Sequence, residues 1–258
     1  VFMKANKFLK NTSWLFSGQI LKMLMSFVVG VITTRYLGPA NYGIINYVNS
    51  YIAFFTTIIS LGFSGIPFFS HDIGGFLGTP TDELYVRWAQ LGLFSSHSRC
   101  HGVGDNNYRE PWRFSKEACD IFRYYDKLRY SLMPYIYEQA EKCTQTGLPM
   151  TRALYLEYPE DRNVRYIDDE YLFGDSLLVA PVLKPLSKTD IREIYLPKGT
   201  WFDYFTKEKI ESTGMWISRK VDLKTMPIFV KEGTVLKYCD AKDNLQNGMG
   251  EIVKTEEY

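Results

Sequence analysis

The stretch SLGFSGIPFFSHDIGGF, which runs from Ser60 to Phe76, divides the chain into two parts of different composition. No Asp or Glu occurs between Val1 and His71, and Asp72 is the first acidic residue. All 29 acidic residues of the chain therefore follow His71. The quoted stretch thus joins an apolar, weakly basic segment to one with mixed charges, and the two segments have different solvent preferences.

Two long apolar segments, 14–38 and 47–69, lie at and before this boundary. Each is long enough to cross the roughly 30 Å hydrocarbon core of a bilayer as a helix, which takes about 20 residues. Lys4, Lys7 and Lys10 place the N-terminus in the cytoplasm by the positive-inside rule. The sequence therefore predicts a membrane-associated helical hairpin. The part of the chain that follows this hairpin is predicted to be cytoplasmic. A helical hairpin buried in a soluble protein stays open as an alternative, because Gly, Ser, Thr and Asn are frequent here.

After the boundary the pattern changes to short apolar runs separated by polar loops. GIPFF (65–69) is typical of a buried strand, and a polar loop that contains His71 follows it. Residues 81–90 are predicted to form a helix capped by Thr81, and LGLFSS (91–96) a second buried strand. These elements make a βαβ unit. Both histidine-bearing loops would then leave the carboxyl ends of parallel strands, the edge that carries the active site in α/β barrels.

The remaining sequence predicts one long helix and then a β-rich region. Apolar residues recur at helical spacing from Ser115, the expected N-cap, to Cys143, and Pro134 should kink this helix near Tyr130. From Leu148 onward, short β-rich runs alternate with Gly and Pro, which favours a β-sandwich. The predicted fold class is mixed α and β.

The segment before the boundary resembles the N-terminus of polysaccharide flippases of the O-antigen type, over about residues 4–62. The resemblance rests on an N-terminal Lys-Asn pair, an apolar segment, the motif RYLGPANYG (35–43) and a second apolar segment. It implies two transmembrane helices within 1–62. A flippase surrounds its pathway with many more helices, so transport by this chain is not expected.

After the boundary, several motifs occur in one order: SGIPFFSHDIGGF, RWAQLGLFSSHSRCHG, REPWRF, LRYSLMPYIYEQA, GLPMTRALYLEYPED, DEYLFGDSLLVAPVL and YLPKGTWFDYFT. Together they resemble glycoside hydrolase family 31, and specifically its α-xylosidase branch, over about residues 61–238. The resemblance implies the last βα units of a truncated (β/α)8 barrel over 63–147, then a proximal C-terminal β-sandwich over 148–258. Its implied activity is hydrolysis of α-glycosidic bonds in carbohydrate metabolism. We interpret the whole chain as a chimeric or truncated gene product.

Family members resemble retaining glycosidases, which need a nucleophile and an acid/base carboxylate about 5–5.5 Å apart. In the family both lie on barrel strands that precede the pair kept here, and residues 1–71 contain no Asp or Glu. We therefore assign no catalytic residue and predict that the chain is inactive. Three alternatives remain: completion in trans by a partner that carries the rest of the barrel, a remnant of a flippase, and a non-catalytic sugar-binding fragment.

The resemblance implies two substrate-binding residues. Asp72, in SHDIGGF, matches the family aspartate that accepts hydrogen bonds from sugar hydroxyls, a task for which a carboxylate offers several lone pairs. His101, in SRCHG, matches a family histidine that also contacts sugar hydroxyls. The alternatives are a loop or cap aspartate and a packed loop histidine. His97 and Arg99 are interpreted as structural, with Arg99 paired to a loop acid such as Asp105.

Other features of the sequence argue against a nucleic-acid partner, a metal site, a cofactor or sugar-stacking tryptophans. The net charge of +1 predicts no nucleic-acid partner, and the four cysteines lack zinc-ligand spacing and are interpreted as reduced thiols. His71, His97 and His101 are not expected to bind a metal, and no cofactor is predicted. Asp175 is expected in a turn. The three tryptophans that could stack on sugars are expected instead to fill a core or an interface: Trp112, Trp201 and Trp216.

Overall fold

The computed structural model describes residues 28–29, 31–32, 35–36, 61–62, 64–104, 108–240 and 251–258. The chain divides into two compact units, Val1–Tyr51 and Ile52–Tyr258. In the first unit, the described residues are helical. Most of the predicted hairpin lies outside the described residues. Among those that are described, no helix is long and apolar enough to cross a membrane.

Helix α2 (Asp82–Leu93) begins as predicted, because the Thr81 hydroxyl accepts a hydrogen bond from the Leu84 amide. The prediction of a strand over 91–96 is wrong, since α2 continues to Leu93. Buried Tyr85, Ala89 and Leu93 recur every four residues along the helix, so its apolar face extends into that run. A short apolar run does not by itself distinguish a buried strand from the end of a helix.

The segments that flank α2 pair in parallel, but over fewer residues than expected. Residues 66–70 are not in a regular strand, and the pairing consists of one isolated parallel bridge between Asp72 and Arg99. The Ile73 amide donates to the Arg99 carbonyl at 2.8 Å, and the Arg99 amide donates to the His71 carbonyl at 3.1 Å. The parallel relation of the two loops is therefore observed, but on the second segment it involves 97–99 instead of 91–96.

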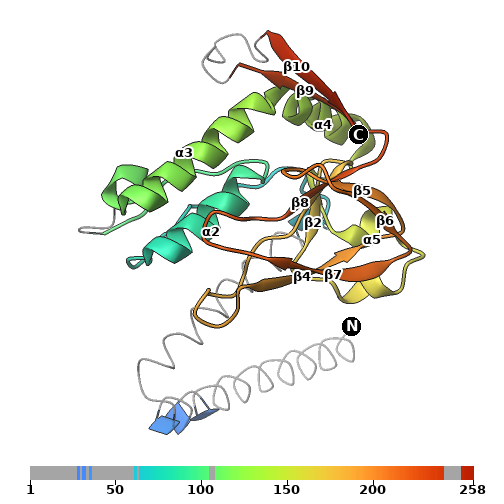
Figure 1. Cartoon of the computed structure of the whole chain (residues 1–258). Helices are drawn as coiled ribbons and strands as arrows, with labels where there is room; N and C mark the ends of the chain where they lie inside the picture. The colour runs from blue at the N-terminus through green and yellow to red at the C-terminus, as the bar shows by residue number, and fades with distance from the viewer. Residues whose placement is uncertain are drawn as a thin grey trace, which may run out of the picture. The chain divides into compact units, whose positions relative to one another are not determined.

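The predicted long helix is broken in two at Leu132. Helix α3 (Lys116–Ser131) is capped by Ser115, as predicted, and α4 (Met133–Thr146) starts with Pro134 in its first turn. Proline lacks an amide donor, which suits the first turn of a new helix and not the interior of a continuous one. Helices α2 and α3 lie side by side (Figure 1).

The rest of the chain forms antiparallel sheets. The largest has the strand order β1-β2-β3-β8-β5-β6, and two further pairs are β4–β7 and β9–β10. The short helical segments are η1 (Pro111–Arg113), α5 (Leu154–Glu157) and η2 (Asn163–Tyr166). The strands are β1 (Thr151–Arg152), β2 (Tyr171–Phe173), β3 (Leu177–Val179), β4 (Ile191–Leu196), β5 (Gly199–Asp203), β6 (Lys209–Ser212), β7 (Met215–Lys220), β8 (Ile228–Lys231), β9 (Val235–Cys239) and β10 (Ile252–Glu257).

One apolar core joins the large sheet to the β4–β7 pair. Leu178 of β3, Tyr195 of β4, Trp201 of β5 and Phe229 of β8 are all buried in it. Buried residues alternate with exposed ones along β6 and along the first four residues of β4, as expected for strands with one buried face. Strands β2 and β3 are buried throughout. The predicted β-rich region is confirmed as antiparallel sheets that follow the helices.

Polar side chains of the helices bind the backbone of the β-rich part. Arg87 of α2 is buried and donates to the carbonyls of Asp222 and Thr225, at 2.8 and 3.0 Å. The Tyr125 hydroxyl of α3 donates to the Lys224 carbonyl at 2.7 Å and accepts from the Met226 amide at 3.0 Å. The segment 222–226 is thereby fixed between the helices and strand β8 (Figure 1).

Candidate functional site

Asp72, the first predicted sugar-contacting residue, lies at the parallel bridge between the two loops. Its Oδ1 accepts a hydrogen bond from Arg99 Nε at 2.6 Å. The Asp72 side chain is 16% exposed and that of Arg99 is 61% exposed, so the pair opens to solvent on the arginine side. Arg99 does pair with an acidic loop residue, as predicted, but that residue is Asp72 instead of Asp105. Asp105 lies outside the described residues.

His101, the second predicted residue, lies on the neighbouring loop and is exposed. Its ring is 5.5 Å from the ring of Phe76, measured between centroids and tilted by 41°. The Val103 amide donates to the Phe76 carbonyl at 3.0 Å, which joins the two loops beyond the bridge. The structure therefore brings the segments that carry Asp72 and His101 together, as their proposed roles require.

A buried arginine that sequence reasoning missed holds the Asp72 loop. Arg109 Nε donates to the Gly75 carbonyl at 2.9 Å, and its Nη2 donates to the Gly78 carbonyl at 2.5 Å. Gly74 has φ of +84°, and a Cβ there would lie 3.0 Å from the Arg109 side chain. Both the backbone conformation and the close approach of Arg109 therefore favour glycine at this position. No local pattern indicates this contact, because Arg109 is 31–34 residues away from its partners.

His71 has a structural role. Its Nδ1 accepts from the Trp88 indole N–H at 3.1 Å, which leaves Nε2 to donate to the Ser95 hydroxyl at 3.1 Å. Burial lowers the pKa of His71 to about 4, against the smaller opposing effect of Asp72, so the imidazole is neutral at pH 7. Within the described part of the chain, no group of His, Cys, Asp or Glu could hold a metal ion.

The other candidate residues divide between structure and surface. Asp175 lies in the turn before β3, as predicted, where it pairs with Lys142 at 2.8 Å. Trp201 is buried in the β-rich core, also as predicted. The same prediction is wrong for Trp112 and Trp216, which are 71% and 54% exposed. Trp216 is one of the exposed positions of strand β7, and its ring meets the ring of its cross-strand partner Tyr195 edge-on, with 5.5 Å between the centroids.

Comparison with known proteins defines the class to which this arrangement belongs. Residues 46–139 match the family model of the glycosyl hydrolases family 31 TIM-barrel domain, and residues 147–236 match that of the family 31 C-terminal domain. This part of the chain therefore belongs to glycoside hydrolase family 31. Residues 8–66 match a third family model, polysaccharide biosynthesis protein, which overlaps the start of the barrel match.

Among curated relatives, alpha-glucosidase 2 of Bacillus thermoamyloliquefaciens is 38% identical over 184 residues, which are 71% of this chain and 23% of the relative. Alpha-xylosidase XylQ of Lactiplantibacillus pentosus is 41% identical over 185 residues, which are 69% of this chain and 23% of the relative. The chain thus spans about a quarter of the length of the curated relatives it matches.

Two solved structures show the same fold. The dextranase of Flavobacterium johnsoniae, complexed with isomaltotriose, has a TM-score of 0.67 and 36% identity over 74% of this chain and 24% of its own. An alpha-xylosidase from a soil metagenome, complexed with xylose, has a TM-score of 0.62 and 30% identity over 68% of this chain and 29% of its own. The sequence identities of 36% and 30% indicate a relationship at the level of the family and not of the fold alone.

Proposed function

We propose that this chain carries the sugar-contacting end of an α-glycosidase active site, with Asp72 and His101 as the residues that contact the sugar. The observation that carries the proposal is the pair of loops joined at the Asp72–Arg99 bridge. In this proposal, 63–147 are the last βα units of a (β/α)8 barrel, and 148–258 form a β-sandwich that follows them in the chain. The relatives act on α-glucosides and α-xylosides, as their names state, and we propose the same substrate classes here.

The geometry suits recognition of vicinal hydroxyls. A carboxylate offers about four lone-pair sites on two oxygens, and Arg99 Nε occupies one of them on Oδ1. The ion pair orients the Asp72 carboxylate, while its remaining sites can accept from sugar O–H groups. His101 has one donor and one acceptor nitrogen when neutral, so it can contact a second hydroxyl. Arg109 holds the Gly75 backbone and thereby positions Asp72 without touching the sugar.

We also propose that the chain does not hydrolyse glycosides by itself. The proposal is supported by the composition of residues 1–71, which contain no Asp or Glu and therefore supply no nucleophile or acid/base carboxylate before the SHDIGGF motif. Binding groups without a nucleophile and an acid/base can hold a sugar but cannot form or break the glycosyl bond. We further propose that the chain associates with a membrane through 14–69, which the polysaccharide biosynthesis match over 8–66 supports. Lys4, Lys7 and Lys10 support a cytoplasmic position for the C-terminal part.

Release of p-nitrophenol from p-nitrophenyl α-xyloside and p-nitrophenyl α-glucoside tests the absence of hydrolysis. The purified 258-residue chain should give no release above buffer. The Asp72→Ala variant serves as the matched control, because it removes the proposed sugar contact. Release well above buffer by the parent chain that disappears in Asp72→Ala would overturn the proposal.

A further inference from the structure

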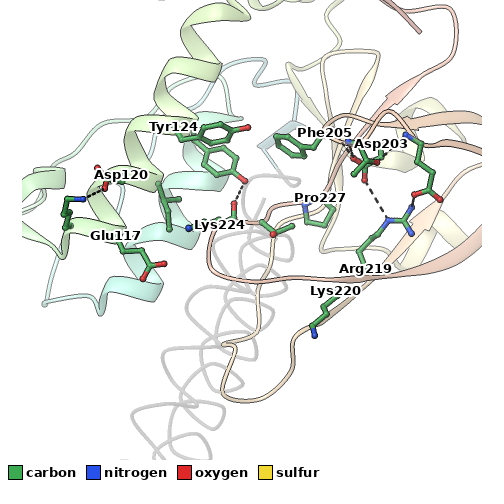
Figure 2. Close-up of a pocket in the computed structure, with 15 residues that line it drawn as sticks. Glu117, Asp120, Tyr124, Asp203, Phe205, Arg219, Lys220, Lys224 and Pro227 are labelled. Atoms are coloured by element: carbon green, nitrogen blue, oxygen red, sulfur yellow. Dashed lines mark hydrogen bonds and ion pairs between the residues drawn. The ribbon is translucent and has the colours of Figure 1, made fainter.

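A cavity of about 1060 Å³ lies between α3 and the β-rich part (Figure 2). Its walls come from α3, from the turn between β5 and β6, from the end of β7, and from the segment 224–227. The residues that line it include neither Asp72 nor His101, so it is separate from the two joined loops. Ligand pockets in proteins typically measure about 300–1,000 Å³, so this one is large enough for a molecule of several rings.

Two exposed aromatic rings form opposite walls of the cavity. Tyr124 of α3 is 53% exposed, and Phe205 of the β5–β6 turn is 37% exposed. Figure 2 shows them directed toward one another, with Pro227 beside them. Each ring is supported edge-on by a buried neighbour: Tyr125 lies 5.3 Å from Tyr124 at 90°, and Tyr204 lies 5.1 Å from Phe205 at 83°. Both ring faces are therefore held in place before any ligand binds.

Hydrogen bonds also fix the backbone of both walls. The Asp203 carboxylate accepts from the amides of Phe205 and Thr206, each at 2.9 Å, which sets the turn that presents the phenylalanine. On the other side, the Tyr125 hydroxyl bonds the Lys224 carbonyl and the Met226 amide. Hydrogen bonds thus fix the backbone on both sides of the cavity.

The charges that line the cavity cancel. Four cationic side chains, Lys116, Arg219, Lys220 and Lys224, meet four carboxylates, among them Asp203 and Glu208. Several are already paired with each other, as in the 2.7 Å contact between Arg219 and Glu208. A lining without net charge does not select a phosphate, a nucleotide or another ion.

Two charged groups and one hydroxyl of the lining remain available for a ligand. Among the described residues, neither the Glu117 carboxylate nor the Lys224 ammonium takes part in an ion pair. The first is an acceptor and the second a donor, and the Tyr124 hydroxyl can act as both. Burial raises the pKa of Tyr124, so that hydroxyl keeps its proton at neutral pH.

We propose that this cavity is a second carbohydrate site, which binds a neutral oligosaccharide of two or three residues between Tyr124 and Phe205. A pyranose combines an apolar C–H face with a rim of hydroxyl donors and acceptors. That combination matches two aromatic faces bordered by mixed polar groups of zero net charge. The inference goes beyond the function proposed above, because this site uses no residue of the Asp72 and His101 loops and no catalytic carboxylate.

Isothermal titration calorimetry of the full chain with isomaltotriose, and separately with maltotriose, tests the proposal. Any detergent in the buffer must lack a sugar headgroup, because an alkyl glycoside would compete. At least one trisaccharide should bind saturably. The Tyr124→Ala/Phe205→Ala double variant should bind at least about tenfold more weakly, a loss of about 1.4 kcal/mol or more. Trp112→Ala, which removes an exposed ring outside the cavity, should leave the affinity unchanged.

The outcomes separate this site from the joined loops. The weakening caused by Tyr124→Ala/Phe205→Ala should be as large in an Asp72→Asn background as in the parent chain, because the two sites share no residue. Binding that is lost in Asp72→Asn but kept in the double variant would overturn the second site while supporting the function proposed for Asp72. No saturable binding by the parent chain would also overturn it. If circular dichroism shows that the double variant is unfolded, Tyr124→Leu and Tyr124→Phe decide: the first, which removes the ring, should weaken binding more than the second, which removes only the hydroxyl. Equal affinity of the two variants would overturn the proposal.

Discussion

The helical part buries His71 and the β-rich part buries Glu170, each in its neutral form, and the two side chains respond to pH in opposite directions. In the helical part, His71 is 6% exposed between Trp88 and Ser95, and burial lowers its pKa to about 4. In the β-rich part, Glu170 is fully buried, and burial raises its pKa to about 8. Burial disfavours the charged form of both groups, which for a base means a lower pKa and for an acid a higher one.

The surroundings of the two groups differ as well. His71 has a polar partner on each ring nitrogen. Glu170 Oε1 accepts from the Tyr195 amide at 2.8 Å, but its Oε2 is buried with no hydrogen-bond partner among the described residues. Nearby Arg192 favours the carboxylate, yet it donates to Asp169 instead. The candidate-site loops are thus supported by a satisfied neutral histidine, and the β-rich core by an incompletely satisfied acid.

The largest expected effect comes from Glu170→Gln. An acid whose pKa rises from 4.5 to about 8 on folding stabilises the fold below pH 4.5 and loses that contribution as the pH rises to 8. The variant does not ionise, so its stability relative to the parent should increase by about 1.4 kcal/mol per pH unit between pH 5 and 8. Urea unfolding at several pH values measures the difference.

Glu211→Gln is the matched control for this substitution, since the Glu211 side chain is 80% exposed. It should shift stability by only a few tenths of a kcal/mol at any of these pH values. A Glu170→Gln curve that runs parallel to that of the parent would show that Glu170 is ionised in the folded protein.

A smaller effect of opposite sign is expected at His71. A base whose pKa falls from 6.5 to about 4 contributes stability that is present above pH 6.5 and is lost as the pH falls toward 4. Protonation of Nδ1 also removes the acceptor of the Trp88 N–H. Hydrogen exchange, corrected for intrinsic rates, should therefore show the amides of Ile73 and Arg99 losing protection between pH 6.5 and 4.5.

Strands β3 and β8 provide the internal comparison, because protonation of Glu170 favours the β-rich part over that same pH range. Their amides should not lose protection with those of the joined loops. The His71→Gln variant should remove the pH dependence at Ile73 and Arg99. Equal loss of protection in both parts, or a pH dependence that persists in the variant, would contradict the contrast.

Sequence reasoning succeeded where the determinants are local. Thr81 and Ser115 cap their helices as predicted, because a cap needs only a hydroxyl three residues before a free amide. It failed at LGLFSS, because six apolar and small residues fit a helix end and a buried strand equally well. In the helix, Gly92 packs against the His71 ring, and a Cβ at this position would lie 2.8 Å from that ring. This contact arises only in the folded protein and could not be predicted from the sequence.

The candidate site was predictable only where local sequence motifs mark its residues. Asp72 and His101 were identified by the motifs around them, and the loops that carry them do meet. Arg109 was missed because its partners are backbone carbonyls, which every residue has and no pattern distinguishes. The cavity between α3 and the β-rich part was also missed, since Tyr124 and Phe205 come from elements about 80 residues apart and meet only in the folded protein.

The most direct test of the central claim is to complete the barrel. Residues 64–258 would be fused behind the preceding part of the Flavobacterium johnsoniae dextranase, and hydrolysis of p-nitrophenyl α-glucoside and α-xyloside measured. The account predicts no turnover by the unfused chain, turnover by the fusion, and a loss of at least about 100-fold in kcat/KM for Asp72→Asn in the fusion, with no loss for Trp112→Ala. Turnover by the unfused chain, or an Asp72→Asn fusion as active as its parent, would contradict it.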